Sequence, residues 1–212
     1  MDITGYVITA IVGYLLGSIP TGYLVAKARG VDIRTVGSKN MGATNVFRTL
    51  GTGPGILVLF VDAAKGFIAS ACAADGVLNV LHVSNPDPQI NHLVAGIAAV
   101  LGHNYTCWLN FKGGKGIATT TGVFLALAPV GVSIAIVVWI VAFVATRYVS
   151  IASILAALAL PLGVWCTQES KAVRTIAIIL GLLAIIKHRA NIQRLMNGTE
   201  NRIVFKNPEG VK

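Results

Sequence analysis

Long apolar runs alternate with short polar segments along the whole chain. A helix needs about 20 mainly apolar residues to cross the hydrocarbon core of a bilayer. Five runs meet this requirement or come close to it, namely residues 3–26, 55–74, 92–109, 150–167 and 173–186. The first run is too long for a cleaved signal peptide and lacks its basic leading segment, so we expect it to remain in the mature protein.

A sixth run, residues 117–146, is about thirty residues long and has a break signal at its middle. The sequence Ala128-Pro129-Val130-Gly131 lies there, and proline disfavours helical geometry in the residue before it. We therefore predict two helices that form a hairpin. With the other five runs, they make an all-α polytopic membrane protein of seven transmembrane helices.

The basic residues test this count, because the cytoplasmic loops of membrane proteins are enriched in Lys and Arg. With the hairpin, fourteen of the 17 basic residues fall on one side of the membrane. A single helix over 117–146 would put Arg147 and the basic C-terminal segment on inconsistent sides. We predict one domain, 1–212, with its N-terminus outside, its C-terminus in the cytoplasm and its location in the bacterial inner membrane.

Composition excludes an ordinary soluble domain. The chain is 55% hydrophobic and only 12% charged, with a mean hydropathy of +0.74, whereas soluble domains carry about 25% charged residues. The net charge of +9 favours an anionic lipid surface as partner before nucleic acid, which we do not expect to bind. The three cysteines, Cys72, Cys107 and Cys166, lie in apolar runs without paired spacing. We expect no disulfide, no metal site and no cofactor.

The first inner loop has the residue types of an anion site. It reads GSKNMGATNVFR over residues 37–48. Small residues let backbone amides approach a phosphate, hydroxyls and amides donate further bonds, and Arg48 offers a planar fork for two oxygens. Composition alone leaves open a simple surface turn that meets lipid headgroups. The candidate substrate-binding residues are Ser38, Asn40, Thr44, Asn45 and Arg48.

A second inner segment favours the phosphate interpretation. Gly102-His103 is followed by FKGGKGIAT over residues 111–119, at the start of the next predicted helix. Unpaired amides and the dipole at a helix N-terminus both favour an anion. The segment lacks the upstream glycine and the following Ser or Thr of a nucleotide P-loop. The candidate residues are Lys112, Gly113, Gly114, Lys115, Gly116 and Thr119.

The third inner segment, residues 187–200, reads KHRANIQRLMNGTE. If it is helical, His188 and Asn191 share one face and lie at the cytoplasmic rim of the bundle. Alternatively, His188 and its cationic neighbours only cap the C-terminus of the last helix.

Together the three segments resemble the bacterial acyl-phosphate:glycerol-3-phosphate acyltransferases, the PlsY family. The resemblance rests on GSKNMGATNVFR, on GH followed by FKGGKGIAT, and on HRANIQRLMNGTE, in the family's order and seven-helix layout. Some relatives have glycine where this chain has Lys39, and an extra cation there would alter phosphate affinity. The resemblance also supports Ser150, which a common N-cap role explains equally well.

The resemblance implies a reaction. The family transfers an acyl chain from acyl phosphate to the sn-1 hydroxyl of glycerol 3-phosphate, which gives 1-acyl-glycerol 3-phosphate and phosphate. We expect direct attack without an acyl-enzyme, in a monomer whose active site faces the cytoplasm. The expected catalytic residues are Ser38, His188 and Asn191. Either His188 or the substrate phosphate takes the proton.

Asp62 and Lys65 are ionisable residues within a predicted membrane helix, where such groups are usually paired or functional. Three residues apart, they share one face, and we expect a mutual ion pair. Direct contact with substrate is the alternative.

A transporter or flippase for an anionic metabolite or lipid is the competing function. The chain shows no inverted half-to-half similarity, and its polar motifs gather at one face of the membrane instead of the midplane. Both features favour the enzyme.

Overall fold

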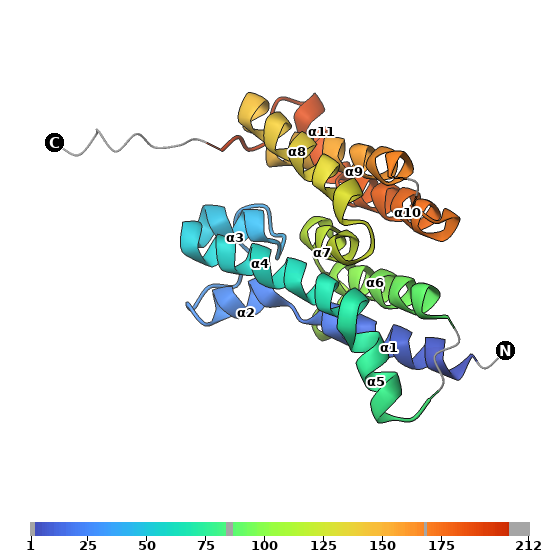
Figure 1. The fold of residues 1–212 in the computed structure, drawn as a ribbon. Coiled ribbons are helices and arrows are strands. Elements are labelled where there is room, and N and C mark those ends of the chain that lie inside the picture. Colours follow the sequence, from blue (N-terminus) through green and yellow to red (C-terminus); the bar gives the residue numbers. More distant parts are fainter. Residues whose placement is uncertain (1–2, 84–86, 168, 204–212) are drawn as a thin grey trace.

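The computed structural model describes residues 3–83, 87–167 and 169–203. All regular structure in these residues is helical, which confirms the predicted all-α class (Figure 1). The first half contains α1 (Thr4–Ser18), α2 (Thr21–Lys27), α3 (Ala43–Leu50), α4 (Thr52–Ile68), a π-helical turn (Ala69–Ala73), α5 (Ala74–Val80), α6 (Pro88–Asn104) and a 3₁₀ turn (Cys107–Leu109). The second half contains α7 (Ile117–Leu127), α8 (Pro129–Thr146), α9 (Val149–Cys166), α10 (Lys171–Lys187) and α11 (Arg189–Met196).

Each of the seven predicted segments is mostly helical in the structure, but fewer meet a strict length test for crossing a membrane. Within the described residues, four stretches are long and apolar enough: Thr4–Lys27, Thr52–Ala73, Pro129–Thr146 and Val149–Cys166. A fifth is added if α10 and α11, bent by 53°, count as one span. These stretches support an integral membrane protein, while seven crossings stay a prediction.

The predicted break in residues 117–146 is confirmed. Ala128 has φ −150° and ψ 68°, outside the helical region, and Pro129 is the first residue of α8. Proline is well tolerated there because the first turn of a helix does not use its own N–H groups.

A second break, which we did not predict, interrupts the first apolar run at Ile19-Pro20, between α1 and α2. Such a break exposes carbonyl groups that must be hydrogen-bonded where water is absent. Thr106 Oγ1 donates to the carbonyl of Ser18 at 2.6 Å, and Lys65 Nζ donates to the carbonyl of Ile19 at 2.9 Å. Side chains of the loop after α6 and of α4 therefore stabilise the broken helix.

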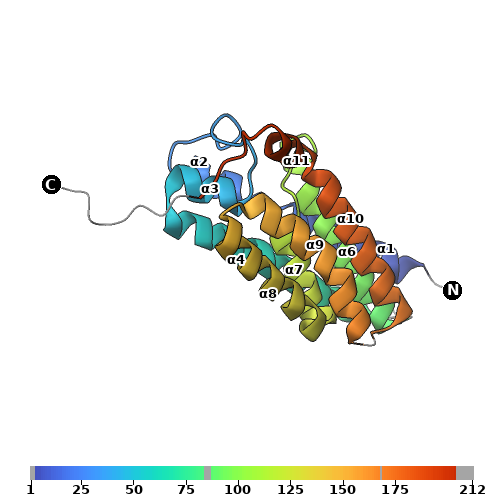
Figure 2. The same ribbon diagram turned by 90° about the horizontal axis from the view of Figure 1, so that it is seen from above.

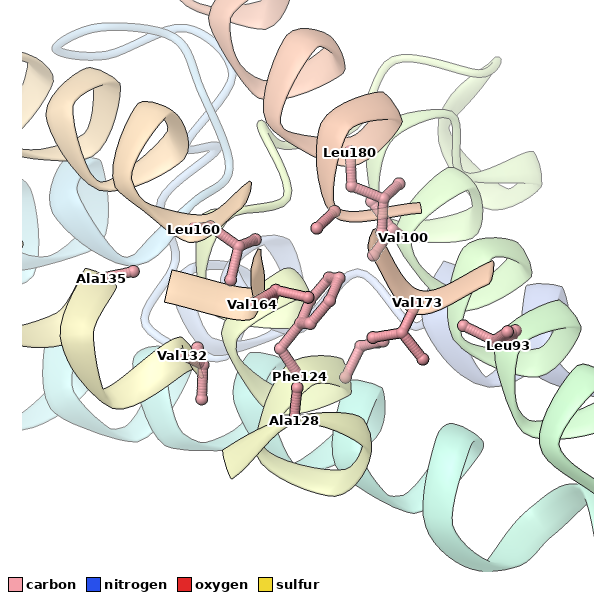
Figure 3. Close-up of a cluster of buried hydrophobic side chains, with 12 residues drawn as sticks. Leu93, Val100, Phe124, Ala128, Val132, Ala135, Leu160, Val164, Val173 and Leu180 are labelled. Carbon is pink, nitrogen blue, oxygen red and sulfur yellow. The ribbon is translucent and has the colours of Figure 1, made fainter. Parts of the chain in front are cut away.

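The helices pack as closely apposed neighbours: α1 on α6, α4 on α7, α8 on α9, and α9 on α10. The short helix α7 lies inside this bundle (Figures 1 and 2). Its Phe124 is fully buried among side chains of the cluster shown in Figure 3, including Val100 of α6, Val164 of α9 and Leu180 of α10.

Large apolar side chains lie instead on the outside of the bundle, where Phe60, Leu162 and Val144 are each about two-thirds exposed. Small residues mediate the closest helix contacts, as is typical in lipid. Gly17 of α1 lies against the backbone of Ala99 of α6, and Gly122 of α7 lies against the carbonyl of Ala63 of α4.

The helices place the polar motifs together. The segment before α3 and the short helices α2, α3 and α11 gather toward one end of the bundle, and α1 begins toward the other end (Figures 1 and 2). Residues from the three motifs are therefore neighbours although they are far apart in the sequence.

We predict that Gly17→Ala destabilises the protein by about 1–3 kcal/mol, because the added methyl group overlaps the Ala99 carbonyl and forces α1 away from α6. The control is Gly53→Ala in α4, where an added methyl meets open space. Thermal unfolding in detergent should show a lower Tm for Gly17→Ala alone. Equal Tm values for the two variants would contradict the close packing of α1 on α6.

Candidate active site

A cavity of about 140 Å³ lies where the three motifs meet. Its walls come from the loop before α3, from α3, α4 and α6, from the start of α7 and the segment before it, from α8 and α9, and from the end of α10, α11 and the segment after it. Ten of the fourteen predicted site residues line it: Ser38, Asn40, Thr44, Asn45, Arg48, Lys115, Gly116, Ser150, His188 and Asn191.

The other four predicted residues do not line the cavity. Lys112 is exposed, and Thr119 is fully buried where α7 packs against Gly66 of α4. The amides of Gly113 and Gly114 donate to the carbonyls of Asn104 and His103 at 3.2 and 3.0 Å. These two amides are therefore not free to bind an anion in this structure.

Gly114 has a packing role that explains the absence of a side chain. A Cβ at this position would overlap the imidazole of His103, at Nε2. The glycine pair therefore lets the segment before α7 lie directly against the end of α6. This contact was not evident in the sequence, since glycines at a phosphate site and glycines at a close backbone contact have the same pattern.

Asn45 organises the first motif from inside. Its Oδ1 accepts from the amide of Ser38 at 2.9 Å, and its Nδ2 lies 2.9–3.2 Å from the carbonyls of Ile33, Val36 and Asn40. Gly37 precedes Ser38 with φ +56°, a conformation that favours glycine. Asn45, which is fully buried, thus holds the loop that presents Ser38 and Asn40 to the cavity.

A chain of hydrogen bonds joins the second and third motifs. Lys115 Nζ donates to Asn191 Oδ1, and Asn191 Nδ2 donates to Glu200 Oε1 at 2.7 Å. Arg194 Nε donates to the other carboxylate oxygen of Glu200, also at 2.7 Å. Glu200 also lines the cavity, and we did not assign it to the site from the sequence. The sequence offers one signal for this role, because Glu200 is the single carboxylate in the otherwise cationic segment of residues 187–200.

The electrostatics of the cavity favour an anion. Burial lowers the pKa of Lys115 to about 8, although the Glu200 carboxylate counteracts this shift. Burial also lowers the pKa of Arg48, whose Nη2 donates to the carbonyl of Asn201 at 2.8 Å. Burial raises the pKa of Glu200, but hydrogen bonds from Asn191 and Arg194 outweigh it and lower the pKa overall. Two cations and an ionised carboxylate are thus expected at neutral pH.

His188 both ends α10 and lines the cavity, so the two interpretations of this residue are compatible. Its Nδ1 lies 2.8 Å from the carbonyl of Ala184 and must donate there, which leaves Nε2 as an acceptor. Burial and the nearby Lys115 ammonium lower the pKa of His188 to about 4. His188 is therefore neutral near pH 7.

The floor of the cavity contains a second group of ionisable side chains. Asp62 and Lys65 form an ion pair of 2.8 Å, as expected from their spacing. His103 Nδ1 lies 3.6 Å from Asp62 Oδ1, and both of these residues line the cavity.

A second cavity of about 310 Å³ adjoins the first. Ser38, Asn40, Lys115 and Asn191 line both cavities, and Lys187, Arg189 and Arg194 add positive charge to the second. The arrangement offers space for two anions on either side of Lys115.

Comparison with known proteins assigns the family. The model of the glycerol-3-phosphate acyltransferase family matches residues 7–198. The chain belongs to this family. It is 47% identical over 203 residues to the glycerol-3-phosphate acyltransferase of Geotalea daltonii, across 96% of this chain and 99% of that protein. It is 46% identical to the one of Geobacter sulfurreducens, across 90% and 94%.

Solved structures agree with this assignment. The crystal structure of PlsY, an integral membrane glycerol 3-phosphate acyltransferase, in its glycerol 3-phosphate form has a TM-score of 0.83 and 41% identity, covering 94% of this chain and 96% of that one. The lysophosphatidic acid form has a TM-score of 0.81 and 40% identity. The protein is therefore an integral membrane acyltransferase of the PlsY family, which displaces the transporter alternative.

We predict that Glu200→Gln lowers stability by about 1–3 kcal/mol at pH 7, because Asn191 and Arg194 lose a charged hydrogen-bond acceptor. Since folding lowers the pKa of Glu200, its stabilisation is present above the ordinary pKa of glutamate and is lost as pH falls through the lowered value. The difference in Tm from wild type should shrink on acidification. Glu169→Gln, in the loop before α10, is the control, and an equal Tm for both variants at pH 7 would contradict this role of Glu200.

Proposed function

We propose that this protein transfers an acyl chain from acyl phosphate to the sn-1 hydroxyl of glycerol 3-phosphate, giving 1-acyl-glycerol 3-phosphate and phosphate. The observation that carries the proposal is the pair of adjoining cavities that share Lys115, because both substrates are phosphates that must lie side by side. Membership of the acyltransferase family supports glycerol 3-phosphate as the acceptor.

Arg48 and Lys115 are the proposed phosphate-binding cations. The hydroxyls of Ser38, Thr44 and Ser150, the Asn40 side chain and the backbone of Gly116 line the same cavity and are proposed as further contacts. The Ser150 hydroxyl is buried at the cavity wall, and its hydrogen bond is among those that lower the pKa of Glu200. Gly113, Gly114 and Thr119 support the site through packing instead, and the exposed Lys112 is given no role.

The chemistry needs little activation of a nucleophile, because an acyl phosphate is already an activated mixed anhydride. The glycerol hydroxyl attacks the acyl carbonyl carbon directly, a new C–O ester bond forms, and the bond to the phosphate oxygen breaks. The three cysteines are not among the residues that line the cavity, which agrees with a route without an acyl-enzyme. Donors at Ser38 and Lys115 would stabilise the developing oxyanion.

His188 and Asn191 are proposed to orient the attacking hydroxyl. The Ala184 carbonyl fixes the ring of His188, and Lys115 and Glu200 fix the amide of Asn191. With a pKa of about 4, His188 is a weak base near pH 7, so orientation fits it better than proton transfer.

The proposed topology has seven crossings, with the N-terminus outside and the cavity at the cytoplasmic side of the inner membrane. The positive-inside pattern of the loops supports this orientation. The eleven residues of α7 reach about 16 Å, roughly half of the hydrocarbon core, and the Gly-rich segment before α7 lies at the cytoplasmic cavity. The protein acts as a monomer in contact with membrane lipid.

The direct test is to incubate the purified protein with palmitoyl phosphate and glycerol 3-phosphate and to measure lysophosphatidic acid and released phosphate. We expect both products in a one-to-one ratio, and none with acyl-CoA as donor. Lys115→Met should lose activity, whereas Lys171→Met, at the start of α10, should keep it. Product from acyl-CoA and none from acyl phosphate would refute the proposed donor.

A further inference from the structure

The segment that follows α11, residues 199–203, contacts three other parts of the chain. Glu200 is bound to α11 by the two hydrogen bonds described above. The carbonyl of the next residue, Asn201, accepts from Arg48 of α3 at 2.8 Å. The last two residues of the segment bond to the corner between α8 and α9. The segment therefore connects α11, α3 and this corner at the edge of the cavity.

The contact with the corner uses carbonyls at the C-terminus of α8. The last carbonyls of a helix have no partner within it, and positive charge is favoured beside them. Arg202 Nε donates to the carbonyl of Thr146 at 3.1 Å, and the amide of Ile203 donates to the carbonyl of Arg147 at 2.9 Å. The guanidinium carbon of Arg202 also lies 5.8 Å from the centre of the Tyr148 ring, within the range of a cation–π interaction. Two different interactions thus bind the Arg202 side chain to the corner.

Arg48 gains a defined position from this segment. It is partly buried at the cavity wall, and no carboxylate in the described part of the chain forms an ion pair with it. A long side chain loses rotamer freedom when it binds a ligand, and a contact that selects the bound rotamer beforehand raises affinity. The Asn201 carbonyl is such a contact. It takes one of the five N–H donors of the guanidinium, so the others remain for a phosphate.

We propose that Arg202 is a positioning residue for the binding of glycerol 3-phosphate. It fixes the segment to the α8–α9 corner, so that the carbonyl of Asn201 holds Arg48 ready for the substrate phosphate. The inference rests on the proposed function, in which Arg48 binds a phosphate. Arg202 lines neither cavity and therefore acts through Arg48. Loss of its contacts leaves Glu200 bound to α11, so the effect is confined to the part of the segment that holds Arg48.

The test is the Kd for glycerol 3-phosphate of the purified full-length protein in detergent, measured without an acyl donor. Arg202→Ala should raise the Kd about three- to tenfold, because a cation–π contact and a hydrogen bond that fix the segment are lost. Its Tm should stay within a few degrees of wild type. The matched control is Arg174→Ala, since Arg174 lies 4.9 Å from the centre of the Trp165 ring near the start of α10, away from both cavities. The control should keep the wild-type Kd.

A double-mutant cycle tests whether Arg202 acts through Arg48. Arg48→Lys should itself weaken binding, because an ammonium cannot hold two phosphate oxygens with a planar fork. Arg202→Ala should then raise the Kd no further in the Arg48→Lys protein, although it does so in the wild-type background. A residue that only supports the fold would weaken binding in both backgrounds.

An unchanged Kd in Arg202→Ala overturns the proposal. So does an equal rise in the wild-type and Arg48→Lys backgrounds, or a rise in Arg174→Ala as large as that in Arg202→Ala. Product formation from acyl phosphate is a separate assay. Its failure refutes the proposed donor, while the Kd values still decide the role of Arg202.

Discussion

The active site depends on one chain of hydrogen bonds, which runs from Lys115 through Asn191 to Glu200. It joins the segment before α7 to α11 and to the residues after it, and Arg194 adds a second bond to the same carboxylate. Burial makes the Lys115 ammonium costly, and Asn191 and Glu200 offset part of this cost by hydrogen bonding and by charge. Without these hydrogen bonds, no contact described above would hold the Lys115 amine between the two cavities.

The membrane imposes a second constraint, which the fold satisfies with polar side chains and small residues. The break at Ile19-Pro20 takes the carbonyls of Ser18 and Ile19 out of the regular helical hydrogen-bond pattern in a medium without water, and Thr106 and Lys65 bond to them. Lys65 in turn requires Asp62, so a backbone irregularity in the first span determines which charges lie under the cavity.

Features encoded locally were predictable from the sequence. Pro129 marked the break between α7 and α8, the spacing of Asp62 and Lys65 predicted their ion pair, and ten of fourteen proposed residues line one cavity. Features that depend on contacts outside a local sequence pattern could not be predicted. Gly113 and Gly114 have the pattern of an anion site, yet their amides bond to Asn104 and His103. The importance of Glu200 likewise depends on Asn191 and Arg194, whose side chains meet it only in the folded chain.

The central claim is that a buried Lys115 binds a substrate phosphate as a cation. The most direct measurement is the Kd for glycerol 3-phosphate of the purified protein between pH 7 and 10, for wild type and Lys115→Arg. With the pKa of Lys115 at about 8, wild-type affinity should fall as pH rises above that value and the ammonium loses its proton. The arginine variant should show no such fall, because a guanidinium stays protonated throughout this range. A wild-type Kd that is constant to pH 10, or the same decline in both proteins, would contradict the claim.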